Sequence, residues 1–454
     1  MPIPGLSNAV ITRERISARA DATERDQARD PLHDFVGGTP GDDNLLGTAG
    51  DDTIFAQAGN DFVRAFAGND FVHGHAGDDY LRGDAGDDSL HGDEDDDYIR
   101  GGADDDIMFG GDGLDRAAFF GAATGVHVSL LLQGGPQDTG DGIDWLYEFE
   151  HLSGTKHDDS LIGDAGDNWL WGDVSGEDTP TGGGNDSLYG GDGDDLLDAG
   201  TGNHVLFGQS GFDSVTVFGN GTDTLGAVKL DLNIQSGFAQ DTGQGIMHLK
   251  GIENLSGSIH GDELIGNDKG NILAGRDGDD QLQGGGGADQ LWGDGAIRVD
   301  SPAGTSGDIM VETQSIDLDG NNADGDDVIS GNGGADFILG GNGGDTLTGG
   351  SGHDTFHYSM IEDSLFADPD LILDCRTTDT INIKDIDGDV STLTNEDFSF
   401  VGSFTGTAAE AVLKYVAGED RTYLFLDDDG DASADGLIVF EGRVTGAFDW
   451  IGVS

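Results

Sequence analysis

The chain has 454 residues, of which 89 are acidic, 20 are basic and 81 are glycine, and its formal net charge at pH 7 is −69. This balance argues against nucleic acid as a partner, because no basic patch is present to meet the phosphates. The single Cys375 rules out an intramolecular disulfide framework and is interpreted as a free thiol, and no apolar run approaches the roughly 20 residues of a membrane span. Without cations such a chain should repel itself, so we expect folding and cation binding to be one event.

Residues 1–36 contain no apolar core of a cleavable signal peptide and mix arginines with acids. We expect a disordered or loosely helical lead-in, with a short partner-binding helix as the alternative.

Residues 37–118 hold nine consecutive nine-residue units of the pattern G-x-x-G-x-D-x-U-x, in which U is apolar. A fixed short period of this kind predicts a repeat architecture. Ala56 and Ala65 replace the first glycine of their units, and Asp95 and Asp104 replace the fourth-position glycine. The sixth position is an aspartate in every unit: Asp43, Asp52, Asp61, Asp70, Asp79, Asp88, Asp97, Asp106 and Asp115.

The last three positions of each unit alternate like a short strand, so only the eighth side chain turns inward. The first six positions are rich in glycine and aspartate and predict a tight turn. Stacked units would join the eighth-position side chains into one apolar seam and align the carboxylates in columns. Such columns repel unless cations lie between them, and oxygen ligands of this kind suit calcium.

These units resemble the calcium-binding RTX (haemolysin-type) repeats. The resemblance implies an all-β fold, namely a parallel β-roll with two repeats in each coil and calcium held between the turns of successive coils. The prediction of bound ions is weakest beside the units that depart from the pattern.

Two β-rich spacers, at 119–153 and 217–256, interrupt the repeats. Residues 137–143 resemble 240–246, and residues 150–154 resemble 253–257, so the chain has a second, larger internal repeat of spacer and nonapeptides. We expect the spacers to continue or cap the roll.

The second repeat block covers 154–216, and the third covers 257–357 with an insertion at 294–321. His204 stands where aspartate is expected, which should cost one site, and residues 317–321 are either an extra calcium loop or a solvated acidic turn. If each run of repeats loses about two sites at its ends, we expect on the order of 15 calcium ions in total. The metal-ligand candidates of these two blocks are Asp159, Asp186, Asp195, Asp213, Asp262, Asp280, Asp289, Asp327, Asp336, Asp345 and Asp354.

Residues 358–454 change to longer alternating runs at 380–383, 411–415, 422–426 and 437–440, which predict a closing β-sandwich or roll cap. Residues 400–408 and 427–431 lie in a region that resembles the C-terminal domain of serralysin-type secreted proteases. The resemblance implies a roll cap and an uncleaved signal for the type I secretion machinery. The chain end, 449–454, has an acid followed by apolar residues, as such signals often do.

The loop that holds Asp427, Asp429, Asp431 and Asp435 has acid spacing like that of an EF-hand, with Gly430 in the turn. This loop is either a calcium site or a plain acidic turn, and we include Asp427, Asp429 and Asp431 among the metal-ligand candidates.

The sequence contains none of the catalytic motifs H-E-x-x-H, G-x-S-x-G and the P-loop. His73 with His75, or His353 with His357, offers a candidate zinc pair, but a solvated surface is the favoured interpretation.

Residues 18 positions apart should share a sheet, so one sheet would expose Phe62 with Arg64, Tyr80 with Arg82, and Tyr98 with Arg100. This aromatic–arginine ladder could dock a surface polysaccharide. The favoured alternative is that the arginines bridge neighbouring acids. If the ladder docks a polysaccharide, replacement of Arg64, Arg82 and Arg100 together by serine should abolish retention of the protein at the cell surface or on the polysaccharide.

The sequence therefore predicts a secreted, extracellular, calcium-folded protein with a structural or adhesive role in a surface layer, a matrix or an adhesin, and we expect no enzyme activity. The alternatives are an enzyme with a divergent site in the spacers and a secreted modulator that binds a partner protein. Self-assembly and surface polysaccharide are the partners to test.

Overall fold

The computed structural model describes residues 35–173, 183–198, 200–217, 226–235, 238–294, 296–300, 308–312, 325–383, 386 and 398–444. The lead-in up to residue 34, the acidic 317–321 loop and the chain end at 449–454 lie outside these residues. Within them the chain forms β-strands and two short 3₁₀ helices, η1 (Leu130–Leu132) and η2 (Ile361–Ser364), and no α-helix. The predicted all-β class is confirmed. None of the helices in the described chain has the length and hydropathy of a membrane span.

The chain divides into two compact units. The first contains Met1–Leu225, Gly245–Ile252 and Arg298–Met310, and the second contains Gly226–Gln244, Glu253–Ile297 and Val311–Ser454.

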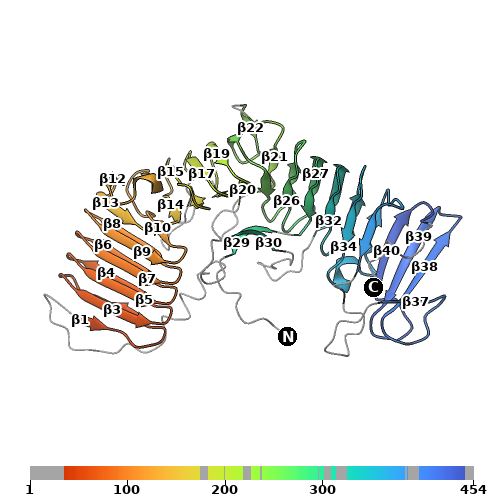
Figure 1. Ribbon diagram of the computed structural model, residues 1–454, viewed down its shortest axis with the longest axis horizontal. Helices are drawn as coiled ribbons and strands as arrows, with labels where there is room; N and C mark the ends of the chain where they lie inside the picture. The colour runs from red at the N-terminus through yellow and green to blue at the C-terminus, as the bar shows by residue number, and fades with distance from the viewer. Residues whose placement is uncertain are drawn as a thin grey trace. The chain divides into compact units, whose positions relative to one another are not determined.

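Successive strands of the first repeat block alternate between two sheets of the first unit (Figure 1). One sheet holds, in order, β1 (Phe35–Gly37), β3 (Thr53–Ala58), β5 (Phe71–Ala76), β7 (Ser89–Glu94), β9 (Ile107–Asp112), β13 (Ile143–Tyr147) and β12 (Pro136–Asp138). The facing strands are β2 (Asn44–Leu46), β4 (Phe62–Ala67), β6 (Tyr80–Ala85), β8 (Tyr98–Ala103), β10 (Arg116–Ala118), β14 (His151–Ser153), β16 (Trp169–Trp171), β18 (Leu196–Asp198) and β20 (Ser214–Thr216).

Parallel pairing joins strands two units apart, which confirms two repeats in each coil. β4 aligns Phe62 with Tyr80 of β6, and β5 aligns Val72 with Leu90 of β7. The eighth-position side chains form the core seam, and Ile54 has no exposed surface. The period of 18 residues thus sets both the register and the core.

The strands inside the first block are longer than the predicted three residues. β3 to β9 each have six residues, because pairing continues through the first three positions of the next unit. The second of those positions has a positive φ, as at His75 (φ 81°) and Asp84 (φ 82°).

The first spacer continues the roll. β13 pairs with β9 in parallel and with β12 in antiparallel orientation, and β14 pairs with β10 and β16. A further sheet of this unit holds β11 (His127–Ser129), β15 (Ser160–Ile162), β17 (Ser187–Asp192), β19 (His204–Ser210) and β23 (Ile246–Lys250).

The second unit repeats the same arrangement. One run of paired strands is β24 (Asn254–Ser256), β26 (Ile272–Ala274), β28 (Gln290–Trp292), β32 (Phe337–Leu339), β34 (Thr355–His357) and β36 (Thr380–Asn382). The other is β21 (Lys229–Asp231), β25 (Glu263–Ile265), β27 (Gln281–Gly286), β31 (Val328–Gly333), β33 (Thr346–Thr348), β35 (Leu371–Ile372), β40 (Gly436–Glu441), β39 (Arg421–Asp427), β38 (Glu410–Val416) and β37 (Ser399–Phe400). The remaining strands are β22 (Gln240–Asp241), β29 (Ala296–Asp300) and β30 (Asp308–Glu312).

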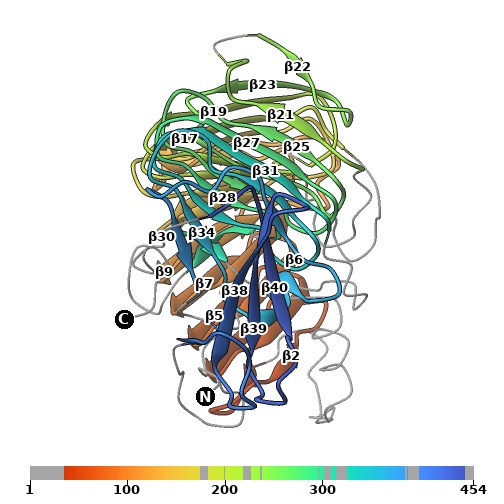
Figure 2. The same ribbon diagram turned by 90° about the vertical axis from the view of Figure 1, so that its right-hand side faces the viewer.

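The predicted closing strands form an antiparallel extension of a roll sheet. β38, β39 and β40 lie side by side (Figure 2), and β40 pairs in parallel with β35 of the roll. The inward side chains of Leu424 and Ile438 have no exposed surface. The cap therefore covers the apolar side chains at the end of the roll.

Candidate metal centres

A continuous column of hydrogen bonds links the sixth-position aspartates. In the first block, from Asp61 to Asp115, each Oδ1 accepts the backbone N–H of the aspartate 18 residues earlier, at 2.6–2.9 Å. Asp79 N–H, for example, donates to Asp97 Oδ1 at 2.9 Å. The column fixes each carboxylate by its first oxygen and aims the second into the turn.

In most units the second oxygen, Oδ2, is buried and receives no hydrogen bond. A buried carboxylate oxygen without a donor is costly, and the chemistry of the position fits a cation. We call these residues the open aspartates: Asp70, Asp79, Asp88, Asp97, Asp106, Asp115, Asp195, Asp280, Asp289, Asp327, Asp336, Asp345 and Asp354.

The first glycine of each unit leaves room beside this oxygen. A Cβ placed on Gly83 would lie 2.1 Å from Asp88 Oδ2 and 2.7 Å from the carbonyl oxygen of Gly101 in the next coil. A carboxylate oxygen and a main-chain carbonyl therefore border the same small space, and both are hard ligands of the kind that calcium takes. Ala56 and Ala65 carry the Cβ that the glycines lack, so the space beside Asp61 and Asp70 is narrower.

Burial raises the pKa of the open carboxyls. The pKa is about 8 for Asp79 and Asp88 and about 10 for Asp97, with loss of solvation as the largest cause and neighbouring acids adding to it. In the absence of a cation, the carboxyl groups of Asp79, Asp88 and Asp97 therefore hold protons at neutral pH. A cation must displace those protons, so its affinity rises with pH.

Four predicted ligands are capped by protein donors. We call Asp43, Asp52, Asp159 and Asp262 the capped aspartates. In each, Oδ2 accepts the backbone N–H of the threonine or serine four residues earlier, for example Thr155 N–H at 2.6 Å, and the same hydroxyl also donates to the carboxylate. Protein donors thus take the place that a cation would take in the open units.

The backbone of the second position separates the two classes. Units with an open aspartate have a positive φ there, as at His75, Arg276 (φ 84°) and Gly341 (φ 109°), except the interrupted unit of Asp327, whose second residue Asp294 is not among the residues with positive φ. The described residues with positive φ do not include Thr39, Thr48, Thr155 or Ser258. A β-branched threonine disfavours positive φ, so its N–H turns toward the carboxylate instead of joining the sheet.

His204 keeps the column intact although it is not an acid. Its Nδ1 accepts the N–H of Asp186 at 3.2 Å, and the ring is fully buried. Asp186 Oδ1 in turn accepts the N–H of Asp159 at 2.9 Å, and Asp213 Oδ1 accepts that of Asp195 at 3.0 Å. The histidine therefore replaces one carboxylate without breaking the ladder.

The column also passes across the interruptions and uses acids outside the nonapeptides. Asp280 N–H donates to Asp327 Oδ1 across 47 residues of sequence, at 2.7 Å. Asp106 N–H reaches Asp144 Oδ1 of the first spacer at 2.9 Å, and Asp345 and Asp354 reach Asp370 and Asp379. Asp144, Asp370 and Asp379 were not among the predicted ligands, although each begins a four-residue D-x-U-x half-unit that the sequence displays.

The acidic loop after β39 brings together a partly different set from the one predicted. The carboxylates of Asp427, Asp429 and Asp435 have oxygens within 4.8 Å of one another, and Asp427 Oδ1 accepts the N–H of Gly430 at 2.8 Å. Asp431 lies outside this group and its Oδ1 accepts the N–H of Ser433. The acid spacing of the loop includes Asp435, but the predicted ligands are Asp427, Asp429 and Asp431, so Asp435 takes the place of Asp431 in the group.

The aromatic–arginine ladder has the expected register. Phe62, Tyr80 and Tyr98 stack with ring centroids 5.1 and 4.8 Å apart. Its arginines make contacts within the chain: Arg64 and Arg82 both pair with Asp84, and the Arg100 guanidinium lies 4.3 Å from the ring centre of Phe120. These contacts favour the interpretation in which the arginines of the ladder contact groups of the same chain over the one in which they dock a polysaccharide.

Two families match the chain. The family model of the RTX calcium-binding nonapeptide repeat (four copies) matches residues 37–65, 67–90, 82–117, 150–174 and 180–215. That of the peptidase M10 serralysin C-terminal domain matches residues 245–452. None of the curated proteins matches the chain.

Three solved structures show similarity at low TM-scores. The AlgE6R2 subunit of the Azotobacter vinelandii mannuronan C5-epimerase is 22% identical over 41% of this chain and 89% of its own, with a TM-score of 0.25. The AlgE6R3 subunit of the same enzyme is 25% identical over 41% and 80%, with a TM-score of 0.19. The extracellular lipase LipA from Serratia marcescens is 14% identical over 72% and 42%, with a TM-score of 0.18.

The assignment rests on the two family matches and on the roll itself. Nonapeptide units, parallel strands two units apart and columns of buried aspartates occur together. The residues matched by the serralysin C-terminal domain include the cap and carry the type I secretion signal of that family. The chain is therefore a secreted, calcium-binding RTX protein with a serralysin-type C-terminal domain and without the serralysin protease motif.

Proposed function

We propose that calcium occupies the open aspartates and that the filled roll has a structural or adhesive role outside the cell, in a surface layer, a matrix or an adhesin. The observation that carries the proposal is the column itself, since buried carboxylate oxygens without a hydrogen-bond donor recur in both compact units of the chain. A roll built in this way stays expanded at low calcium and folds where calcium is abundant. No catalytic activity is part of this proposal.

Exposed acids support a role in calcium-dependent association. The fifth position of each unit forms a second ladder at the turn, in which Asp105 N–H donates to Asp87 Oδ1 at 3.1 Å. Asp51, Asp87 and Asp105 are exposed. A row of outward carboxylates can share calcium with a second copy or with another anionic surface.

The test is a calcium titration followed by circular dichroism and light scattering together. We expect β-structure to appear cooperatively at roughly 0.1 to 1 mM calcium, the range of extracellular modules, and large assemblies to follow. Folding with a steady monomer would contradict self-assembly and favour a soluble modulator that binds a partner.

A matched variant separates assembly from folding. Asp87→Asn with Asp105→Asn removes two outward charges, and Asn60 and Asn69 already occupy the same position of their units. The variant should fold at the wild-type calcium concentration and scatter less light. Equal scattering by both proteins would exclude this acidic row as the contact.

A further inference from the structure

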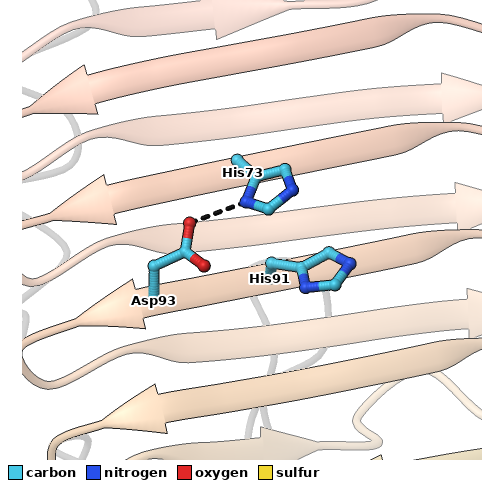
Figure 3. A group of neighbouring side chains, drawn as sticks. All are labelled: His73, His91 and Asp93. Atoms are coloured by element: carbon cyan, nitrogen blue, oxygen red, sulfur yellow. Dashed lines mark hydrogen bonds and ion pairs between the residues drawn. The ribbon is translucent and has the colours of Figure 1, made fainter.

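Strands β5 and β7 carry a cluster of three histidines and one aspartate that the calcium column does not use. His73 is the register partner of His91, and His75 is the partner of Asp93, so the four side chains occupy the corners of a square. All four lie on the outward side of the sheet, because the residues between them, such as Val72, are buried. Figure 3 shows His73, His91 and Asp93 converging from the two strands.

The distances suit a small metal ion. Asp93 Oδ2 lies 2.7 Å from His73 Nδ1 and 3.3 Å from His75 Nδ1. His73, His91 and Asp93 each offer a ligand atom within 4.8 Å of the others. Two ligands of a tetrahedral zinc ion with bonds of 2.0–2.1 Å lie about 3.3 Å apart. Small side-chain rotations therefore bring His73, His91 and Asp93 to a common centre, and His75 lies next to Asp93 as a fourth ligand.

His91 is held in a suitable orientation. Its Nε2 lies 3.1 Å from the hydroxyl oxygen of Ser89 on the same strand. With Nε2–H donated to that oxygen, the lone pair is on Nδ1. A metal-binding imidazole is usually oriented by such a hydrogen bond from its other nitrogen.

Aromatic rings shield the square on both sides. The ring of Phe55 stacks on His73 with centroids 5.6 Å apart, and Phe109 stacks on His91 at 4.5 Å. The side chains of His73 and Asp93 are 20% and 32% exposed. The site is thus partly dehydrated, which strengthens metal–ligand attraction, and it stays accessible from solvent.

We propose that His73, His75, His91 and Asp93 bind a divalent transition-metal ion, with Zn²⁺ as the probe. Three imidazole nitrogens and one carboxylate oxygen suit zinc, whereas calcium takes oxygen ligands almost throughout. The second predicted histidine pair differs, because His353 Nδ1 contacts the carbonyl oxygen of Thr378 and His357 contacts the amide of Asn382. That pair supplies the control.

The experiment is calorimetric titration of the calcium-loaded full chain with Zn²⁺ in excess calcium, and visible absorption after loading with Co²⁺. The test variants are His91→Phe and Asp93→Gly, which copy the residues Phe109 and Gly111 of the next strand in the same register. They keep the stacking and the backbone conformation and remove one ligand each. The control variant is His353→Asn with His357→Asn.

We expect one zinc ion that excess calcium does not displace, and an intense Co²⁺ absorption of tetrahedral type. Each test variant should weaken zinc binding at least about tenfold, and the control should match the wild type. The proposal is wrong if calcium displaces the zinc, if the test variants bind zinc as tightly as the wild type, or if the control variant loses the same ion.

Discussion

The open and capped aspartates occupy the same position of the same repeat and yet differ in what surrounds their second oxygen. Asp97 buries Oδ2 without a donor, whereas Asp159 surrounds it with the N–H and hydroxyl of Thr155. For this pair the pKa of Asp97 is about 10 and that of Asp159 about 6, because the hydrogen bonds to Asp159 offset part of the burial, whereas the open Asp70 also has a pKa of about 6. The comparison shows that a repeat motif by itself does not define a cation site. A threonine or serine at the second position supplies the donors that Oδ2 of an open aspartate lacks.

Removal of calcium should have the largest effect. With the ions chelated at pH 8, the buried carboxylates of open units repel one another, and we expect loss of most of the β-structure. Far-UV circular dichroism before and after chelation, with calcium then restored, measures this change. Retention of the full β-signal after chelation would refute the calcium-dependent roll.

The calcium-free protein should respond to pH in an unusual direction. The folded pKa of Asp79 and Asp88, about 8, lies above the unfolded value of 3.8, so their contribution to stability is fully present below about pH 4 and is lost as the pH rises through 8. We therefore expect more β-structure at pH 4 than at pH 8 in chelator. Asp79→Asn with Asp88→Asn, which cannot titrate, should reduce this dependence, and an unchanged profile would show that total charge controls it.

Filling the space beside an open aspartate should remove an ion. In Gly92→Ala, the new Cβ would lie 1.9 Å from Asp97 Oδ2 and 2.7 Å from the carbonyl oxygen of Gly110. We expect fewer bound calcium ions and a loss of unfolding free energy of about 1–3 kcal/mol, as for other overpacked sites. Calcium counting by mass spectrometry and thermal unfolding test this. Gly41→Ala, with no atom within 4 Å of its Cβ, is the control and should leave both quantities unchanged.

The smallest effect is expected at a capped aspartate. Thr48→Val removes the hydroxyl that lies 3.0 Å from Asp52 Oδ2 and keeps the shape and the backbone N–H. Because the hydroxyl of Thr48 is only half-buried, its loss should cost about 0.5–1.5 kcal/mol of unfolding free energy. Thermal unfolding should show a small decrease, and the calcium count should stay the same. A lower count would mean that Asp52 binds calcium and that the distinction between the two classes is wrong.

The sequence by itself determined the repeat, its register and its apolar seam, because a nine-residue period with one apolar and one acidic position allows few arrangements. It also identified the spacers and the four closing runs, whose strands β36, β38, β39 and β40 begin and end within a few residues of the expected bounds. These features follow from local patterns that repeat along the chain.

The tertiary structure decided which aspartates are open. The donor to each Oδ1 comes from a residue 18 or more positions away, and across the third block from 47 positions away, so no local pattern reveals it. Asp144 and Asp370 join the column from outside the nonapeptides, and although each begins a D-x-U-x half-unit in the sequence, only the structure shows that its Oδ1 accepts an N–H of the column. In the acidic loop, the structure groups Asp435 instead of Asp431 with Asp427 and Asp429. Hydrogen bonds are satisfied in three dimensions, and the distinction between a capped carboxylate and a metal ligand is set by what the neighbouring coil places beside it.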